Sequence, residues 1–508
     1  MIVLAQYRPT RCASPWFKPK LSCGKKNSGN PLAPSSPRRT GRKGLRRDSP
    51  ASGTANRSRS KLPCVHGRAQ DARRNAPSVE ANTQAPSPAE MDGLLDEILP
   101  VIVSFLPAHD AVRTCVLAKR WRHVWTSAPA IRITAIKGFR SADQFNRFVD
   151  RLLLQRRQGL CPLESCEFHM VETDFEFDWS ACVEHVYLHN LQSALDCHVQ
   201  ALRCHFMPTN PTDFAEDLQE PTAPFLSNHI QRLQLSFIRL SLDFSGCPKL
   251  VDLEMHGCVI LADSILSNSV QHLSMCCCQL YTRHRTSISL PHLVRLDFTD
   301  CFGKVPLFES LPSLEKAIVR IGEFTGDECD GSDSVCCLQE NACWECRFAF
   351  EFDAARRRSY LFQGLSRASH LELSASYDHA FIFQRDLKWC PKFPMLKTLV
   401  MDDWCLDADL SAVILFIQQS PNLEKLTLEL FEEFDSSMVS EGSNHLLPGA
   451  VPDHLKMVEI KCEMVDVRVN KVLKILTTYG ISLDIIYIRQ ADTSPGCSAF
   501  VSTGFNLN

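Results

Sequence analysis

Cysteine and histidine side chains can bind a metal or act as nucleophiles, and the sequence holds 24 cysteines and 17 histidines. The densest group is Cys336, Cys337, Cys343 and Cys346. Cys343 and Cys346 have the spacing of a zinc-ligand pair, but two adjacent cysteines make an awkward second half for a tetrahedral site. No second pair stands at finger-like distance. We therefore favour reduced thiols over a metal at this place.

The patterns of known catalytic sites are missing from the sequence. There is no phosphate-binding loop, no Gly-x-Ser-x-Gly, no His-Glu-x-x-His, and no Gly-x-Gly-x-x-Gly between a strand and a helix. His109, His123 and the other histidines stand singly in apolar or turn contexts. No apolar run approaches the ~18 residues of a membrane span. We predict a chain without catalytic residues, cofactor, metal or membrane contact.

Two runs of apolar residues at helical spacing lie between residues 94 and 125, LLDEILPVIVSFLPAHDAVRTCVLAKRWRHVW. Between the runs, Pro107 cannot continue a helix and Asp110 can cap the next one. The pattern predicts a helical hairpin. Because two short helices cannot bury all of these side chains, part of the surface is expected to pack against another protein. The alternative is that they form only a local core.

The second half of this segment resembles an F-box, whose last helix reads Val-Arg-Thr-Cys-Val-Leu-x-x-Arg-Trp-Arg-x-x-Trp. The matching residues are Val112, Arg113, Thr114, Cys115, Val116, Leu117, Arg120, Trp121, Arg122 and Trp125. The first half departs from the family at Leu95, where proline is usual. Pro100 falls inside the expected first helix, where it would remove a hydrogen bond and cost roughly 3 kcal/mol. We assign the F-box to residues 91–131, with residues 112–125 as one helix.

An F-box implies a partner, a small adaptor of the Skp family that in turn docks on a cullin scaffold. Aromatic and aliphatic anchors carry most of the energy of such an interface. The residues expected to bind the adaptor are Leu94, Ile98, Leu99, Ile102, Leu106, Val112, Val116, Leu117, Trp121 and Trp125.

A second pattern recurs after residue 125, in which apolar residues stand at a start, three positions on and five positions on. It marks a short strand with one inward face. The starts are Leu163, Val183, Val199, Ile230, Leu250, Val270, Leu293, Leu314, Leu396, Leu423 and Leu455. From residue 230 they step by 20, 20, 23 and 21 residues, within the 20 to 29 residues of leucine-rich repeats. Three units add a cysteine eight residues after the start, Cys258, Cys278 and Cys301, where a small side chain can satisfy backbone groups inside a bend.

The repeat needs a cap at each end because one unit cannot bury its own inner face. Residues 142–158 carry Phe145, Phe148, Val149, Leu152 and Leu153 at helical spacing after a cap at Ser141, and this helix is expected to join the F-box to the repeats. Residues 421–490 resemble the FBD module of plant F-box proteins, with a helix in VRVNKVLKILTTYG that stops at Gly480 and a strand in ISLDIIYIR.

Charge sets the first 90 residues apart. They hold 18 Lys and Arg against 4 Asp and Glu, a balance of +14, whereas the remainder of the chain balances to −17. The composition predicts a disordered basic tail. It could bind nucleic acid or act as a nuclear signal, it could be an organellar transit peptide within residues 1–60, or it could be an upstream extension without a role. Residues 491–508 are expected to form a flexible tail.

The sequence thus predicts an α/β repeat, an irregular leucine-rich-repeat solenoid over residues 132–420, preceded by a small all-α F-box domain and a disordered tail. The insert Glu323–Asp353 is either a recognition loop or a repeat of irregular register. The whole arrangement resembles plant F-box proteins with leucine-rich repeats, which implies the substrate receptor of a cullin-based ubiquitin ligase, in the nucleus or cytoplasm. The alternatives are an F-box scaffold without ubiquitin transfer and a nucleic-acid binder acting through the tail.

Overall fold

The structure is a computed structural model. It describes residues 96–134, 139–159, 161–174, 178–209, 226–240, 244–280, 285–322, 325, 359–376, 379–406, 409–431 and 454–490. Several predicted features lie outside these residues: the basic tail, Leu94 and Leu95, the cysteine cluster 336–346, most of the insert, and residues 491–508.

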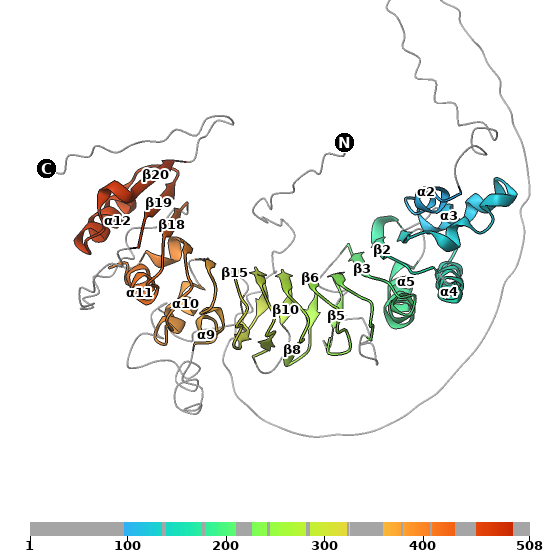
Figure 1. The fold of residues 1–508 in the computed structure, drawn as a ribbon, viewed down its shortest axis with the longest axis horizontal. Helices are drawn as coiled ribbons and strands as arrows, with labels where there is room; N and C mark the ends of the chain where they lie inside the picture. The colour runs from blue at the N-terminus through green and yellow to red at the C-terminus, as the bar shows by residue number, and fades with distance from the viewer. Residues whose placement is uncertain are drawn as a thin grey trace, which may run out of the picture. The chain divides into compact units, whose positions relative to one another are not determined.

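Parallel strands dominate the fold. Among the described residues, thirteen strands form one sheet in the order β1-β2-β3-β4-β6-β9-β12-β15-β16-β17-β18-β19-β20. The strands are β1 (Ala130–Thr134), β2 (Ser165–Val171), β3 (Ala201–Met207), β4 (Arg232–Ser236), β6 (Asp252–His256), β9 (His272–Cys276), β12 (Arg295–Thr299), β15 (Lys316–Ile321), β16 (His370–Ala375), β17 (Thr398–Asp402), β18 (Lys425–Leu430), β19 (Met457–Cys462) and β20 (Ile486–Gln490). This mixed α/β architecture with parallel strands confirms the predicted class at that level (Figure 1).

The predicted apolar spacing corresponds to the buried face of this sheet. Leu233, Leu253, Leu273 and Leu296 occupy the same register position of four neighbouring strands, and each is buried. The next inward residue of each strand, two positions on, is buried as well. Because side chains alternate along a strand, the intervening residues form a second, open face. One face therefore builds the core and the other faces solvent.

Two smaller sheets lie after the strands of the middle units. Their order is β13-β10-β7-β5 and β14-β11-β8. The strands are β5 (Arg239–Leu240), β7 (Val259–Ile260), β8 (Ser264–Leu266), β10 (Gln279–Leu280), β11 (Ser287–Ser289), β13 (Phe302–Gly303) and β14 (Leu307–Phe308). Within the described residues, the units of β6, β9 and β12 thus each consist of one strand of the large sheet and two short strands, the unit of β4 adds β5, and these units stack in register.

The turn after the large-sheet strand repeats from unit to unit. Phe237, Gly257, Cys277 and Asp300 follow β4, β6, β9 and β12, and all have positive φ, 56°, 59°, 53° and 50°. The N–H of each donates to a carbonyl oxygen at the end of the next strand, at 2.9 to 3.1 Å. The left-handed backbone conformation therefore recurs at this position of each unit, whether or not the residue is glycine.

The three turn cysteines behave as predicted. Cys258, Cys278 and Cys301 are buried, and their thiols donate to the carbonyl oxygens of Leu235, Met255 and Met275 at 3.4, 3.4 and 3.5 Å. Burial raises the pKa of Cys258 and Cys278 well above the ordinary value. These thiols satisfy backbone groups and are poor nucleophiles.

Helices replace the short strands in the outer units. They are α4 (Ala142–Gln158), α5 (Trp179–His185), α6 (Leu191–Leu195), α9 (Phe362–Leu365), α10 (Ala380–Leu387), α11 (Ser411–Gln419) and α12 (Val467–Thr478), with a π-helix at Val186–Asn190 and 3-10 helices at Glu172–Asp174, Asp403–Cys405 and Leu483–Ile485. Within the described part of the chain, no helix is long and apolar enough to cross a membrane.

Two repeat assignments differ from the sequence prediction. The unit that starts at Val183 is helical, because its residues fall in α5 and the following π-helix and pack there as a helical core. A unit not predicted from the sequence starts at Ala368 and places Leu371 on β16. Alanine at the start and the insert before it hide this unit from the leucine pattern.

The two predicted capped helices are present. Ser141 caps α4 by accepting the N–H of Gln144 at 3.4 Å. Helix α12 ends at Thr478, and Gly480 follows with φ 90°, where a side chain would be strained.

The helical segment of residues 96–128 corrects three predictions. Its helices are α2 (Leu99–Val103) and α3 (Ala108–Arg113), followed by 3-10 helices at Thr114–Val116, Lys119–Trp121 and Val124–Ser127. Residues 112–125 are therefore not one helix, because the backbone is extended at Ala118 (φ −159°, ψ 162°).

The other two corrections concern the ends of these helices. Pro100 lies in the first turn of α2, where its missing N–H would be unpaired anyway, so the expected cost does not arise. Pro107 and not Asp110 is the N-cap of α3, and Asp110 lies inside the first turn. A short helix that begins at Leu99 accommodates the proline without a kink.

Candidate functional site

The helical segment divides the predicted adaptor residues into core and surface. Leu99, Trp121 and Trp125 are buried, and Leu106 and Val112 are partly buried against the same core. The side chain of Trp121 is only 4% exposed. These residues hold the segment together. In this conformation the rings of Trp121 and Trp125 are therefore not free to contact a partner.

Apart from Leu94, which lies outside the described residues, the remaining predicted residues are exposed. They are Ile98, Ile102, Val116 and Leu117, and the described chain adds two that the prediction did not include, Val101 and Phe105. Val116 is 81% and Phe105 66% exposed. Several exposed apolar side chains in one short segment mark a candidate interaction surface. The exposure of Phe105 follows from the shortness of α2, which ends before it. The sequence pattern predicted longer helices and therefore did not predict that Phe105 is exposed.

Helix α4 fixes the helical segment to the first strands. Arg156 of α4 is buried and donates to the carbonyl oxygens of Thr126 and, at 2.9 Å, Ala128. His109 of α3 lies 5.9 Å from Phe148 of α4, ring centre to ring centre, in an edge-to-face contact. The predicted joining helix therefore positions this segment by a charged hydrogen bond and ring packing.

The open face of the large sheet is a second candidate surface, and it is largely polar. Its first register row contains Arg232, Asp252, His272, Arg295, Lys316, His370, Thr398 and Lys425. Its second contains Gln234, Glu254, Ser274, Asp297, Ile318, Glu372, Val400, Thr427 and Glu459, of which Ile318 and Val400 are apolar. A hollow of about 320 Å³ lies over β6, β9, β12 and β15 and is lined by residues of both rows.

Ion pairs order this face. Arg232 lies 3.0 Å from Asp252, and His272 hydrogen-bonds the same carboxylate. Burial opposes ionisation, but the bonds from His272 and Arg232 hold the pKa of Asp252 below its ordinary value. Glu459 likewise pairs with Lys425 at 2.8 Å and Arg489 at 3.1 Å. Such pairs favour a charged, specific contact with a partner over an apolar one.

The two surfaces and the fold define a class of protein. A stack of parallel repeat units presents a broad polar face, and a short helical segment with exposed apolar side chains precedes it. Repeat arrays of this kind serve as extended binding surfaces.

Comparison with known proteins identifies the relatives. An F-box/FBD/LRR-repeat protein of Arabidopsis thaliana is 24% identical over 437 residues, 79% of this chain and 92% of the relative. An FBD-associated F-box protein of the same plant is 24% identical over 73% of this chain and 78% of its own length. An Arabidopsis F-box/LRR-repeat protein is 29% identical over 41% of this chain and 50% of its own length. No family model and no solved structure matches.

These homologues confirm the resemblance predicted from the motifs. The chain is similar over most of its length to plant F-box proteins that carry leucine-rich repeats and an FBD module.

Proposed function

We propose that this protein is the substrate-recognition subunit of an SCF-type cullin-RING ubiquitin ligase. The helical segment would be an F-box that binds a Skp-family adaptor and through it a cullin scaffold, and the stacked units would be a leucine-rich-repeat solenoid that binds a target protein. The names of the relatives support this proposal. The observation that carries it is the exposed apolar surface of the helical segment, which remains uncovered although Leu99, Trp121 and Trp125 already close the local core.

We propose a narrower set of residues for the adaptor contact. We assign it to the exposed side chains Ile98, Val101, Ile102, Phe105, Val116 and Leu117. The buried members of the predicted set support these residues from behind. An exposed aliphatic or aromatic side chain gains most when a partner covers it, because its apolar area is still in contact with water.

In this proposal the chain supplies no reacting group. It would hold a target lysine near the ubiquitin-charged enzyme, and the rate gain would come from effective concentration and orientation. The polar open face of the sheet would choose the target. Nucleic acid is an unsuitable partner for the acidic remainder of the chain, so any such contact would belong to the basic tail. We place the complex in the nucleus or cytoplasm.

The test is adaptor binding by the full chain. Val116→Glu should abolish co-purification with a Skp-family adaptor, because it puts a charge into an apolar contact. Val467→Glu is the matched control, since Val467 is also a valine and is also 81% exposed, but it begins α12 in the FBD-like module. Equal loss in both variants, or none in either, would count against the assigned contact.

A second measurement distinguishes the proposed ligase subunit from a scaffold that uses the F-box without ubiquitin transfer. Proteins captured by the intact chain while the proteasome is blocked, and also by a chain with residues 91–131 deleted, are candidate targets. A reconstituted ligase should then attach ubiquitin to one of them in a manner that requires Val116. Adaptor binding without any transfer would support the scaffold.

A further inference from the structure

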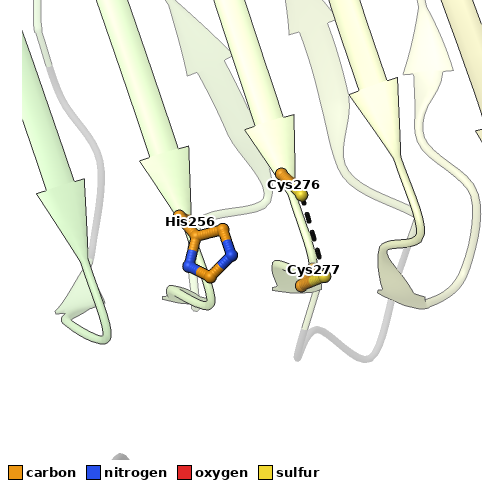
Figure 2. A group of neighbouring side chains, drawn as sticks. All are labelled: His256, Cys276 and Cys277. Carbon is orange, nitrogen blue, oxygen red and sulfur yellow. Dashed lines mark hydrogen bonds between the residues drawn. The ribbon is translucent and has the colours of Figure 1, made fainter. Parts of the chain in front are cut away.

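Three side chains with metal-binding atoms meet at the end of the open face. His256 ends β6, Cys276 ends β9, and Cys277 follows in the turn (Figure 2). One ligand atom from each residue lies within 4.8 Å of the others. His256 is exposed, and both cysteines are partly exposed. The group is therefore open to a dissolved ion, unlike the buried turn thiols of Cys258 and Cys278.

The repeat itself brings these residues together. His256 and Cys276 are register partners on adjacent parallel strands, and the buried residue before each, Met255 or Met275, shows that both face the open side. Cys277 lies at the left-handed turn position with φ 53°. Its backbone N–H is bonded to the carbonyl oxygen of Thr299 at 3.0 Å, which fixes the turn. Two adjacent cysteines can thus direct their sulfurs to one point, which regular strand geometry would prevent.

The distance between the sulfurs fits a tetrahedral ion. The Sγ atoms of Cys276 and Cys277 lie 3.7 Å apart (Figure 2). Two zinc–sulfur bonds of ~2.3 Å at a tetrahedral angle span about 3.8 Å. The ligand atoms lie within 4.8 Å of one another. A zinc site with a nitrogen bond of ~2.0 to 2.1 Å would place nitrogen and sulfur about 3.6 Å apart, so the imidazole nitrogen needs an approach of about 1.2 Å at most.

A neighbouring ring supports the imidazole. Phe237 packs edge-to-face against His256, with ring centres 5.4 Å apart. Gly257 makes room for this ring, because a Cβ at that position would lie 2.6 Å from a Phe237 ring carbon. The ring of Phe237 thus holds one side of His256.

We propose that His256, Cys276 and Cys277 bind Zn²⁺ through one nitrogen and two sulfurs, with the fourth position open to water. Imidazole with thiolate ligands selects this kind of soft or borderline ion. The site does not depend on the proposed ligase function. It differs from the Cys336–Cys346 cluster considered in the sequence, whose residues lie outside the described part of the chain.

The experiment uses the full chain, reduced and stripped of metal. Zn²⁺ is titrated against a chromogenic chelator, and Co²⁺ serves as a spectroscopic probe that gives a sulfur-to-cobalt band only when thiolates are ligands. The intact chain should bind one tight equivalent that the Cys276→Ser/Cys277→Ser variant lacks. The zinc affinity of this variant should be at least about 100-fold lower than that of the intact chain, since changing only the residues that support a ligand lowers metal affinity by about 10 to 100-fold. His256→Ala should weaken binding yet keep the sulfur band.

Matched controls make the test specific. Cys343→Ser/Cys346→Ser removes another closely spaced pair and should leave this equivalent intact. Thermal unfolding without metal should be the same for all variants, because the three residues lie at the surface. Equal zinc binding by the intact chain and the Cys276/Cys277 variant would overturn the proposal, as would a chain that takes Cu⁺ but no Zn²⁺ at these residues.

Discussion

The helical segment of residues 96–128 and the large sheet bury their apolar residues in different ways. In the sheet, Leu253, Leu273 and Leu296 are all buried, because strand alternation and in-register stacking leave one inward face. In the helical segment, Trp121 is buried while Val116, five residues earlier, is 81% exposed. The same apolar residue types therefore serve as core in one region and divide between core and surface in the other.

The difference shows where a partner can bind. A sheet unit is completed by its two neighbours along the stack, so it needs no outside protein to cover its apolar side. The helical segment lies at one end of the repeats and has turns too short to enclose its own apolar residues. Its remaining apolar surface is where the proposed adaptor would bind, whereas the charged groups of the sheet would contact the proposed target.

The largest expected effect is on the core of the helical segment. Trp121→Ala should lower the free energy of unfolding by ~3 to 5 kcal/mol, because it removes a buried ring and leaves a cavity. Chemical denaturation followed by fluorescence and by circular dichroism measures it. A loss below about 1 kcal/mol would show that Trp121 is not a core residue and would restore it as a direct adaptor contact.

A slightly smaller effect is expected in the sheet. Leu273→Ala should cost ~2 to 5 kcal/mol, since Leu273 is buried between Leu253 and Leu296. Ser274→Ala is the control on the same strand, because Ser274 faces the open side, and it should change stability by less than about 0.5 kcal/mol. Similar costs for both variants would mean that the two faces of β9 are not distinct.

Stability should also respond to pH through Asp402 at the end of β17. Burial raises its pKa to about 7, from 3.8, against opposing hydrogen bonds from Ser374, Ala375 and Trp404. The unfolded carboxyl then loses its proton at lower pH than the folded one, so the free energy of unfolding should decrease as pH rises from about 4 to about 7. Asp402→Asn should remove up to ~1.4 kcal/mol per pH unit of this slope. Urea midpoints of both proteins at pH 5 and 7 measure it, and parallel curves would contradict it.

The smallest effect on stability is expected at Val116. Val116→Ala should change the free energy of unfolding by less than about 0.5 kcal/mol, because the side chain is already in water. The same substitution should weaken adaptor binding measurably by calorimetry. A large loss of stability would place Val116 in the core and remove the contrast with Trp121.

The sheet was predictable because its signal repeats. The spacing of apolar residues seen at Leu250, Leu253 and Met255 recurs at almost constant intervals, so each unit supports the strand predicted for the unit before it. The caps at Ser141 and Gly480 were predictable from local backbone chemistry. The prediction of a strand at Val183 was wrong, because apolar residues spaced by three and two positions also fit a helix. Only the packing of Val183 and Val186, in α5 and the π-helix that follows, distinguishes the two.

The candidate sites were less predictable. Periodicity assigned Trp121 and Val116 to one surface, because it assumes a continuous helix, and the extended backbone at Ala118 breaks that helix. The group of His256, Cys276 and Cys277 could not be read from the sequence at all. It requires the register of two strands 20 residues apart and a left-handed turn at a cysteine.

The reactivity of the buried thiols can report local opening of the repeat units. Cys204, Cys258 and Cys278 lie in separate units, and burial raises the pKa of each far above that of a free thiol. A thiol of this kind reacts with an alkylating reagent only when its unit opens. Because each unit is stabilised mainly by its neighbours, the labelling rate at each cysteine would report how far opening at one end of the stack spreads toward the middle.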